Sequence, residues 1–183
     1  MSVSPDIVAG GVAVLVGNPV PGSRTAVVAT ALAEGLLGSA SEPAEVVELA
    51  DLVDARWYAE DPLVSRTHET IARARLVVLA TPVYQASFTG LLKVFLEGLE
   101  PAALASTAVV PVVLAGSGAH GALADLQLRI VLQAVGASVP VPSLVLEERE
   151  LDRLPDHVDA WVRRFGPAVD AVAAALHGPG VAA

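Results

Sequence analysis

The segment LVVLATPVYQASFTGLLKVFLE, residues 76–97, joins an apolar stretch to a helical pattern through a loop that carries no charge. Residues 76–80 are a continuous aliphatic run, which is typical of a strand buried on both faces of a parallel sheet. After the loop, apolar residues recur with helical spacing over residues 88–99. The segment therefore predicts a strand, a loop and a helix in direct succession, which is the repeating unit of parallel α/β sheets.

The same alternation extends along the chain. Further strands are expected at residues 12–16, 44–49, 107–116 and 138–147, and further helices at residues 25–37, 65–75, 119–135 and 155–176. This pattern fits an α/β, doubly wound, five-stranded parallel sheet with the strand order 2-1-3-4-5. We assign residues 1–176 to a single domain and residues 177–183 to a flexible tail.

The composition argues against several classes of function. The formal net charge is −9, whereas nucleic acids and anionic membrane surfaces require clustered Lys and Arg, so neither is an expected partner. The chain has no cysteine, which excludes disulfides, thiol catalysis and cysteine-ligated metals. No residue is predicted to bind a metal, and a cytoplasmic location is expected.

In the predicted order, the loops at residues 17–25, 81–88 and 115–121 meet beyond the carboxyl ends of the strands, where such sheets bind ligands. The first loop, GNPVPGSRT, opens a helix, so its backbone N–H groups and the helix dipole could hold a phosphate. Ser23, Arg24 and Thr25 add polar donors. The loop also resembles a Walker A loop, but Ser23 and Arg24 stand where Lys and Ser/Thr are required. An ordinary capped turn is the alternative.

The third loop, GSGAHG at residues 116–121, has the form G-x-G-x-x-G between a strand and a helix, which is the context of a dinucleotide-binding loop. The acidic residue of that fingerprint is expected about 20 residues later, and Glu147 and Glu148 come late for it. A flexible turn of small residues is equally compatible. In the second loop, Pro82 restrains the chain and Tyr84 offers a flat face with a polar tip. We therefore expect a flat aromatic ligand to dock there.

These loops carry a resemblance to a known family. ATPVYQASFTGLLK, residues 80–93, resembles the Thr-Pro-Val-Tyr-x-Ala-Ser/Tyr-x-Gly-x-Leu-Lys stretch of the NADPH-dependent FMN reductases, which are flavodoxin-like, and especially of the alkanesulfonate-system flavin reductases. GNPVPGSRT is similar to that family's phosphate loop, although Val20 stands where the family usually has arginine, and GSGAH is similar to its third flavin loop.

The resemblance implies which residues bind the cofactor. Asn18, Ser23, Arg24 and Thr25 would hold the FMN phosphate. The isoalloxazine would be lined by Pro82, Val83, Tyr84 and Gln85, and its far side would be bordered by Gly116, Ser117 and Gly118.

The implied activity is NAD(P)H-dependent reduction of FMN by hydride transfer from nicotinamide C4 to flavin N5. Reduced flavin would then pass to an acceptor such as a monooxygenase. Two alternatives stay open, a quinone or azo reductase with FMN as a prosthetic group, and a non-catalytic flavodoxin-like module that binds a partner or carries electrons. Because the cofactors perform the chemistry, no side chain is predicted as a catalytic acid or base.

The helix expected at residues 88–99 also suggests self-association. Its apolar set is wider than one sheet-facing stripe requires, so part of it, including Leu96, is expected to face outward. The alternative is that the last helix covers the excess. Since the resembled family forms dimers and tetramers at this edge, we expect a homodimer or tetramer whose contact includes this helix.

Overall fold

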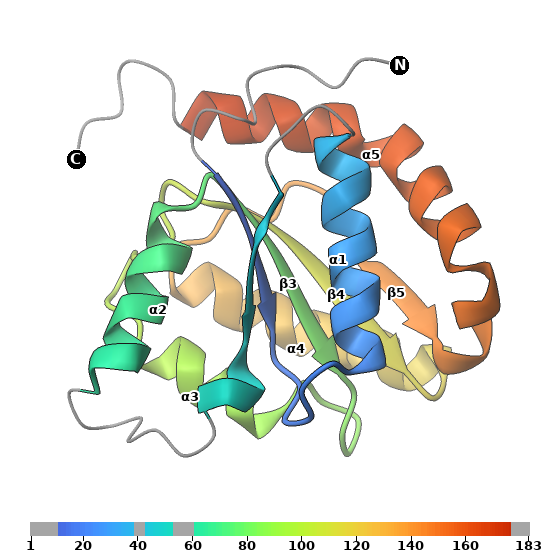
Figure 1. Cartoon of the computed structure of the whole chain (residues 1–183), viewed down its shortest axis with the longest axis horizontal. Coiled ribbons are helices and arrows are strands. Elements are labelled where there is room, and N and C mark those ends of the chain that lie inside the picture. Colours follow the sequence, from blue (N-terminus) through green and yellow to red (C-terminus); the bar gives the residue numbers. More distant parts are fainter. Residues whose placement is uncertain (1–10, 39–42, 53–60, 177–183) are drawn as a thin grey trace.

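The computed structural model describes residues 11–38, 43–52 and 61–176. In these ranges the elements follow the order β1 (Val12–Val16), α1 (Arg24–Leu37), β2 (Glu45–Glu48), η2 (Leu49–Leu52), α2 (Pro62–Arg73), β3 (Leu76–Pro82), α3 (Gly90–Glu97), β4 (Ala108–Ala115), α4 (Gly118–Ala134), β5 (Leu144–Glu147), η3 (Glu148–Arg153) and α5 (Leu154–Leu176) (Figure 1). The strands alternate with helices as the sequence predicts. The expected tail, residues 177–183, lies outside the described residues.

The strands form one five-stranded sheet in the order β2-β1-β3-β4-β5, and every pairing is parallel. This confirms the predicted flavodoxin-like order. The chain moves to one side after β1 and to the other after β3, so the switch point lies between these two strands. The loops that follow β1 and β3 therefore leave adjacent strands at the same edge.

Helices cover both faces of the sheet (Figure 1). One core joins α1 and α5 to the even-numbered residues of β1 and β3, such as Val14 and Val78. The other joins α2, α3 and α4 to the odd-numbered residues of the same strands, such as Leu15 and Leu79. Because successive side chains of a strand point to opposite faces, both sets must be apolar. This explains why β1, β3 and β4 read as unbroken aliphatic runs.

Several element boundaries differ from the predictions for local reasons. β5 is limited to residues 144–147, because Pro140 and Pro142 supply no N–H to a ladder; only an isolated bridge at Ser138 precedes it. α2 begins earlier than expected, since Asp61 caps it and Pro62 occupies its first turn. α5 matches the expected range and continues through Pro167; this residue and the residue four positions before it are both exposed.

The prediction that part of the apolar surface of residues 88–99, including Leu96, faces outward is wrong. Leu96 is 1% exposed, and Phe88, Leu92, Phe95 and Leu99 are also buried in the core between α2, α3, α4 and the sheet. His68 of α2 closes this core. Its ring lies 4.5 Å from that of Phe95, and burial lowers its pKa. The excess apolar surface is covered within the chain by α2 and α4, and not by the last helix.

No helix among the described residues has the combination of length and apolar character needed to cross a membrane.

The burial of Leu96 leads to a stability prediction. Leu96→Ala should lower the free energy of unfolding by about 2–5 kcal/mol, because the truncation leaves a cavity in a packed core. Leu63→Ala on α2 is the matched control; that side chain is exposed, so we expect a change within about 0.5 kcal/mol. Urea unfolding of both variants measures the difference. Equal losses would contradict the placement of Leu96 in the core.

Candidate functional site

Segments that follow β1, β3 and β5 and the end of β4 meet around a pocket of about 260 Å³ at the carboxyl edge of the sheet. Six of the predicted site residues line it, together with three that were not predicted. The full lining is Asn18, Val20, Ser23, Arg24, Thr25, Pro82, Tyr84, Leu114 and Glu148. The structure therefore brings the first and second loops together at one pocket.

The first loop is organised around the N-terminus of α1. Ser23 is the N-cap residue, and its Oγ accepts a bond of 3.3 Å from the N–H of Ala26. This bond uses a lone pair of the hydroxyl oxygen and leaves the hydroxyl proton able to donate. A helix N-terminus with a free hydroxyl donor is suited to an anion.

Asn18 shapes this loop from inside. It is buried, its Oδ1 accepts from the N–H of Val20 at 2.9 Å, and its Nδ2 donates to Oγ1 of Thr25 at 3.1 Å. Two of its hydrogen-bonding positions thus serve the loop itself. Gly22, which has a φ of 61°, donates its N–H to the Glu48 carboxylate at 2.9 Å. The loop is held in shape by its own Asn18 and by Glu48 at the end of β2.

Two buried threonines connect the first loop to the second. Oγ1 of Thr89 donates to the carbonyl oxygen of Gly17 at 2.5 Å and also accepts from the N–H of Leu92, which caps α3. The N–H of Thr89 donates in turn to Oγ1 of Thr81 at 3.2 Å. Gly17 is required at this contact, because a Cβ there would lie 2.7 Å from Cβ of Leu92. The geometry of each loop therefore depends on the other.

The second loop contains a tight turn in an uncommon conformation. Tyr84 and Ser87 exchange backbone hydrogen bonds of 2.9 and 3.1 Å, and the two residues between them, Gln85 and Ala86, have φ values of 52° and 61°. Turns of this kind prefer Asn or Gly at both central positions, so neither residue found here is favoured. Such backbone strain is often found at functional sites. The Tyr84 side chain at the base of this turn is 49% exposed.

The remaining predicted residues lie beside the pocket and do not line it. The N–H of Val83 donates to the carbonyl oxygen of Leu114 and extends the β3–β4 pairing beyond the strand, while Gln85 is exposed at the turn. Gly116, Ser117 and Gly118 form the entry to α4, where Ser117 is the N-cap residue without a side-chain capping bond. Their backbone lies at the same sheet edge, beyond Leu114.

Three residues at this edge were missed as contributors. Glu148 follows β5 and forms an ion pair with Arg24 across the pocket at 3.0 Å; its place after a strand was visible in the sequence, but its partner was not. Thr89 was visible only as part of a helical pattern. Gln127 of α4 accepts a bond of 2.6 Å from Oγ of Ser87, and nothing local to either residue indicates this contact.

Among the described residues, no group of three His, Asp or Glu could hold a metal ion.

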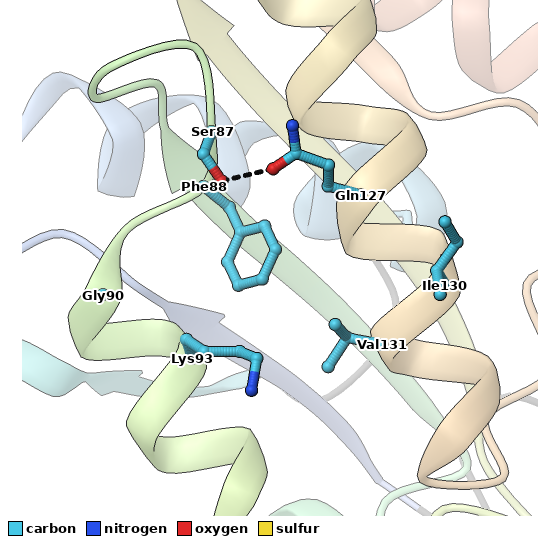
Figure 2. A pocket seen from close by; sticks show the side chains of 7 residues that line it. All are labelled: Ser87, Phe88, Gly90, Lys93, Gln127, Ile130 and Val131. Carbon is cyan, nitrogen blue, oxygen red and sulfur yellow. Dashed lines mark hydrogen bonds between the residues drawn. The ribbon is translucent and has the colours of Figure 1, made fainter.

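A second, more apolar pocket of about 450 Å³ lies between the second loop, α3 and α4 (Figure 2). Phe88 and Val131 point into it, Lys93 and Ile130 stand at its sides, and the Ser87–Gln127 bond closes one end. Lys93 pairs with Glu97 along α3. The pocket is continuous with an exposed apolar face of α4 made by Leu123, Leu126 and Ile130.

Comparison with known proteins identifies the family. The family profile described as NADPH-dependent FMN reductase matches residues 11–150, which include all three loops. The chain belongs to this family. In this NADPH-dependent FMN reductase family member, the sheet has the strand order that the resemblance implied.

Individual relatives are similar over part of their length. The chain is 35% identical over 101 residues to an FMN reductase (NADPH) of Pseudomonas putida, covering 55% of this chain and 50% of that protein. It is 36% identical over 87 residues to an FMN reductase (NADPH) of Escherichia coli K12, covering 48% and 44%. The matched regions thus span about half the length of these curated relatives.

The similarity in structure is broader. An NADH:FMN oxidoreductase (EMOB) in its apo form matches 93% of this chain and 92% of its own, with a TM-score of 0.75 and 29% sequence identity. Most of the fold of this family member therefore has a counterpart in a solved structure.

The threonine link between the loops leads to a prediction. Thr89→Val keeps the side-chain shape but removes the cap of α3 and leaves the carbonyl oxygen of Gly17 without its donor. We expect the free energy of unfolding to fall by about 1–3 kcal/mol. Thr70→Val on the half-buried side of α2 is the control, and urea unfolding is the measurement. A loss no greater than that of the control would contradict the role given to Thr89.

Proposed function

We propose that this chain is an NAD(P)H-dependent FMN reductase that binds FMN across the pocket at the carboxyl edge of the sheet. The observation that carries the proposal is the meeting of an anion-suited helix N-terminus with an uncharged, tyrosine-bearing loop at one pocket. Family membership and the names of the relatives support it. The chemistry of the donors fits FMN, since polar groups gather at one end and apolar or neutral groups at the other.

The phosphate of FMN is assigned to the N-terminus of α1. Ser23 offers its hydroxyl proton, the first backbone N–H groups of the helix point toward the same side, and Arg24 supplies the positive charge. Thr25 lines the pocket but is 1% exposed and accepts from Asn18, so we give it and Asn18 mainly the task of shaping the loop.

The flavin ring is assigned to the second and third loops. Tyr84 offers an exposed aromatic face, and the backbone of Pro82, Val83 and Gln85 is neutral, so the ring's polar edge can be bonded without added charge. Gly116, Ser117 and Gly118 border the far side at the entry to α4. FMN, when bound, supplies the hydride-accepting ring, and the protein orients it and excludes water. Transfer of reduced flavin to a monooxygenase and a cytoplasmic location stay predictions.

The partner proposed for the apolar face of α4 is a second copy of this chain. Leu123, Leu126 and Ile130 recur at i, i+3 and i+7 and form one exposed stripe beside the apolar pocket of Figure 2. Asp125 and Arg129 of the same helix pair with each other and turn toward Ser143, so they leave the stripe uncharged. Each chain has a net charge of −9, so two copies repel each other least when their contact surfaces carry no charge. A two-fold contact of this stripe with itself satisfies these conditions.

The phosphate assignment predicts a selective loss of affinity. Ser23→Ala should weaken FMN binding by about 1–2 kcal/mol, or roughly 5- to 30-fold in Kd, because a donor to a charged acceptor is removed. Riboflavin, which lacks the phosphate, should bind both proteins equally. Titration followed by flavin fluorescence measures both ligands, with the exposed Ser65→Ala as control. An equal loss for the two flavins would contradict the assignment.

The self-association proposal predicts a change in mass. Ile130, which is 61% exposed, lies in the stripe, and Ile130→Glu should place a charge in each half of the contact and shift a dimer or tetramer to monomer. Val27→Glu on α1, a position that is 57% exposed away from α4, is the matched control and should leave the mass unchanged. Light scattering across a dilution series decides it. A wild-type monomer at micromolar concentration would refute the proposal.

A further inference from the structure

An acidic side chain occupies the positively charged end of the candidate flavin pocket. Arg24 is the first residue of α1 and Glu148 is the first residue after β5, and both line the pocket. Nη2 of Arg24 lies 3.0 Å from Oε1 of Glu148, so the ion pair spans the pocket from the β1 side to the β5 side. Strand ends that are far apart in the sequence are thus joined at the point assigned to the phosphate.

Charge balance gives this contact its significance. Arg24 is the one basic residue among those lining the pocket, and Glu148 is the one acidic residue there. The pair therefore cancels the charge that an incoming phosphate would need. A phosphate that binds Arg24 must either displace the carboxylate or share the guanidinium with it, at the cost of bringing two anions together.

The neighbouring carboxylates are engaged elsewhere. Both carboxylate oxygens of Glu147 lie 3.1 Å from nitrogens of Arg149, so its charge is balanced away from Arg24. Glu48 accepts the backbone N–H of Gly22 and contributes to the shape of the first loop. Neither forms an ion pair with Arg24. Glu148 is the acidic group that the arrangement directs at the phosphate site.

We propose that Glu148 lowers the affinity for phosphorylated flavin by competing with the phosphate for Arg24. The inference rests on the proposed function, since it concerns the same pocket. Arg24 is 63% exposed and Glu148 is 47% exposed, so water weakens the pair enough for a ligand to open it. Because Glu148 occupies Arg24, FMN binds more weakly than it would with Arg24 free of this carboxylate. The weaker binding favours exchange of FMN over its retention. Glu148 determines ligand affinity and has no part in the chemistry.

The test compares two flavins on matched variants. Glu148→Gln should lower the Kd for FMN by roughly three- to tenfold at neutral pH, because it removes the group that competes with the phosphate for Arg24. The Kd for riboflavin should stay within twofold of wild type. Glu69→Gln is the control; it removes the same charge from an exposed ion pair with Arg73 on α2. Flavin fluorescence titrations read affinity directly and require no turnover.

A second background separates competition from general repulsion. In Arg24→Gln, where nothing is left to compete for, Glu148→Gln should change the FMN Kd by less than twofold. The full gain in that background would overturn the proposal, as would unchanged or weaker FMN binding by Glu148→Gln alone. Tighter binding of riboflavin and FMN alike would overturn it too. If wild type binds neither flavin, the proposed function fails and this inference fails with it, whereas measurable wild-type binding without a Glu148 effect overturns only the inference.

Discussion

The hydrogen bond from Thr89 to the carbonyl oxygen of Gly17 is the constraint on which the candidate site depends. It connects the residue before α3 to the residue after β1, and Thr81 at the end of β3 completes the link. Gly17 directly follows β1 and Thr81 lies at the end of β3, so the link joins the two strands that flank the switch point of the sheet, although its residues are separated in sequence. The first and second loops separate only beyond this link. A few buried polar contacts to the sheet therefore fix the positions from which both loops reach the pocket.

Beyond the link, the second loop depends on α4 as well as on the sheet. The turn at Gln85 and Ala86 has positive φ values at both central residues. This left-handed conformation costs free energy for residues other than Gly or Asn. The bond from Ser87 to Gln127 fixes the end of this turn to α4, one turn of helix away from Ile130. The same helix thus carries the proposed self-association stripe and a support for the flavin loop. The proposed assembly and the proposed flavin binding therefore share a structural element.

Most of the fold could be predicted because its signals are local. The aliphatic runs of β1, β3 and β4, and the helical spacing between them, depend on residues close in sequence, and the strand order followed from their alternation. The errors arose where contacts between residues distant in sequence determine burial or pairing. Leu96 was expected at the surface, since sequence alone does not show that α2 and α4 close over α3. In the same way, Arg24 was recognised from its loop, but its partner Glu148 is 124 positions away and could only be found in space.

The central strands and the pocket loops differ in how they are anchored. β3 and β4 are buried along their whole length and hydrogen-bonded on both sides, whereas the turn at Gln85 and the entry to α4 are bonded at a few points near water. We expect amide protons of these strands to exchange with solvent through global opening, and those of the loops through local fluctuations of lower free energy. We therefore expect the pocket loops to fluctuate locally many times within the lifetime of one folded molecule.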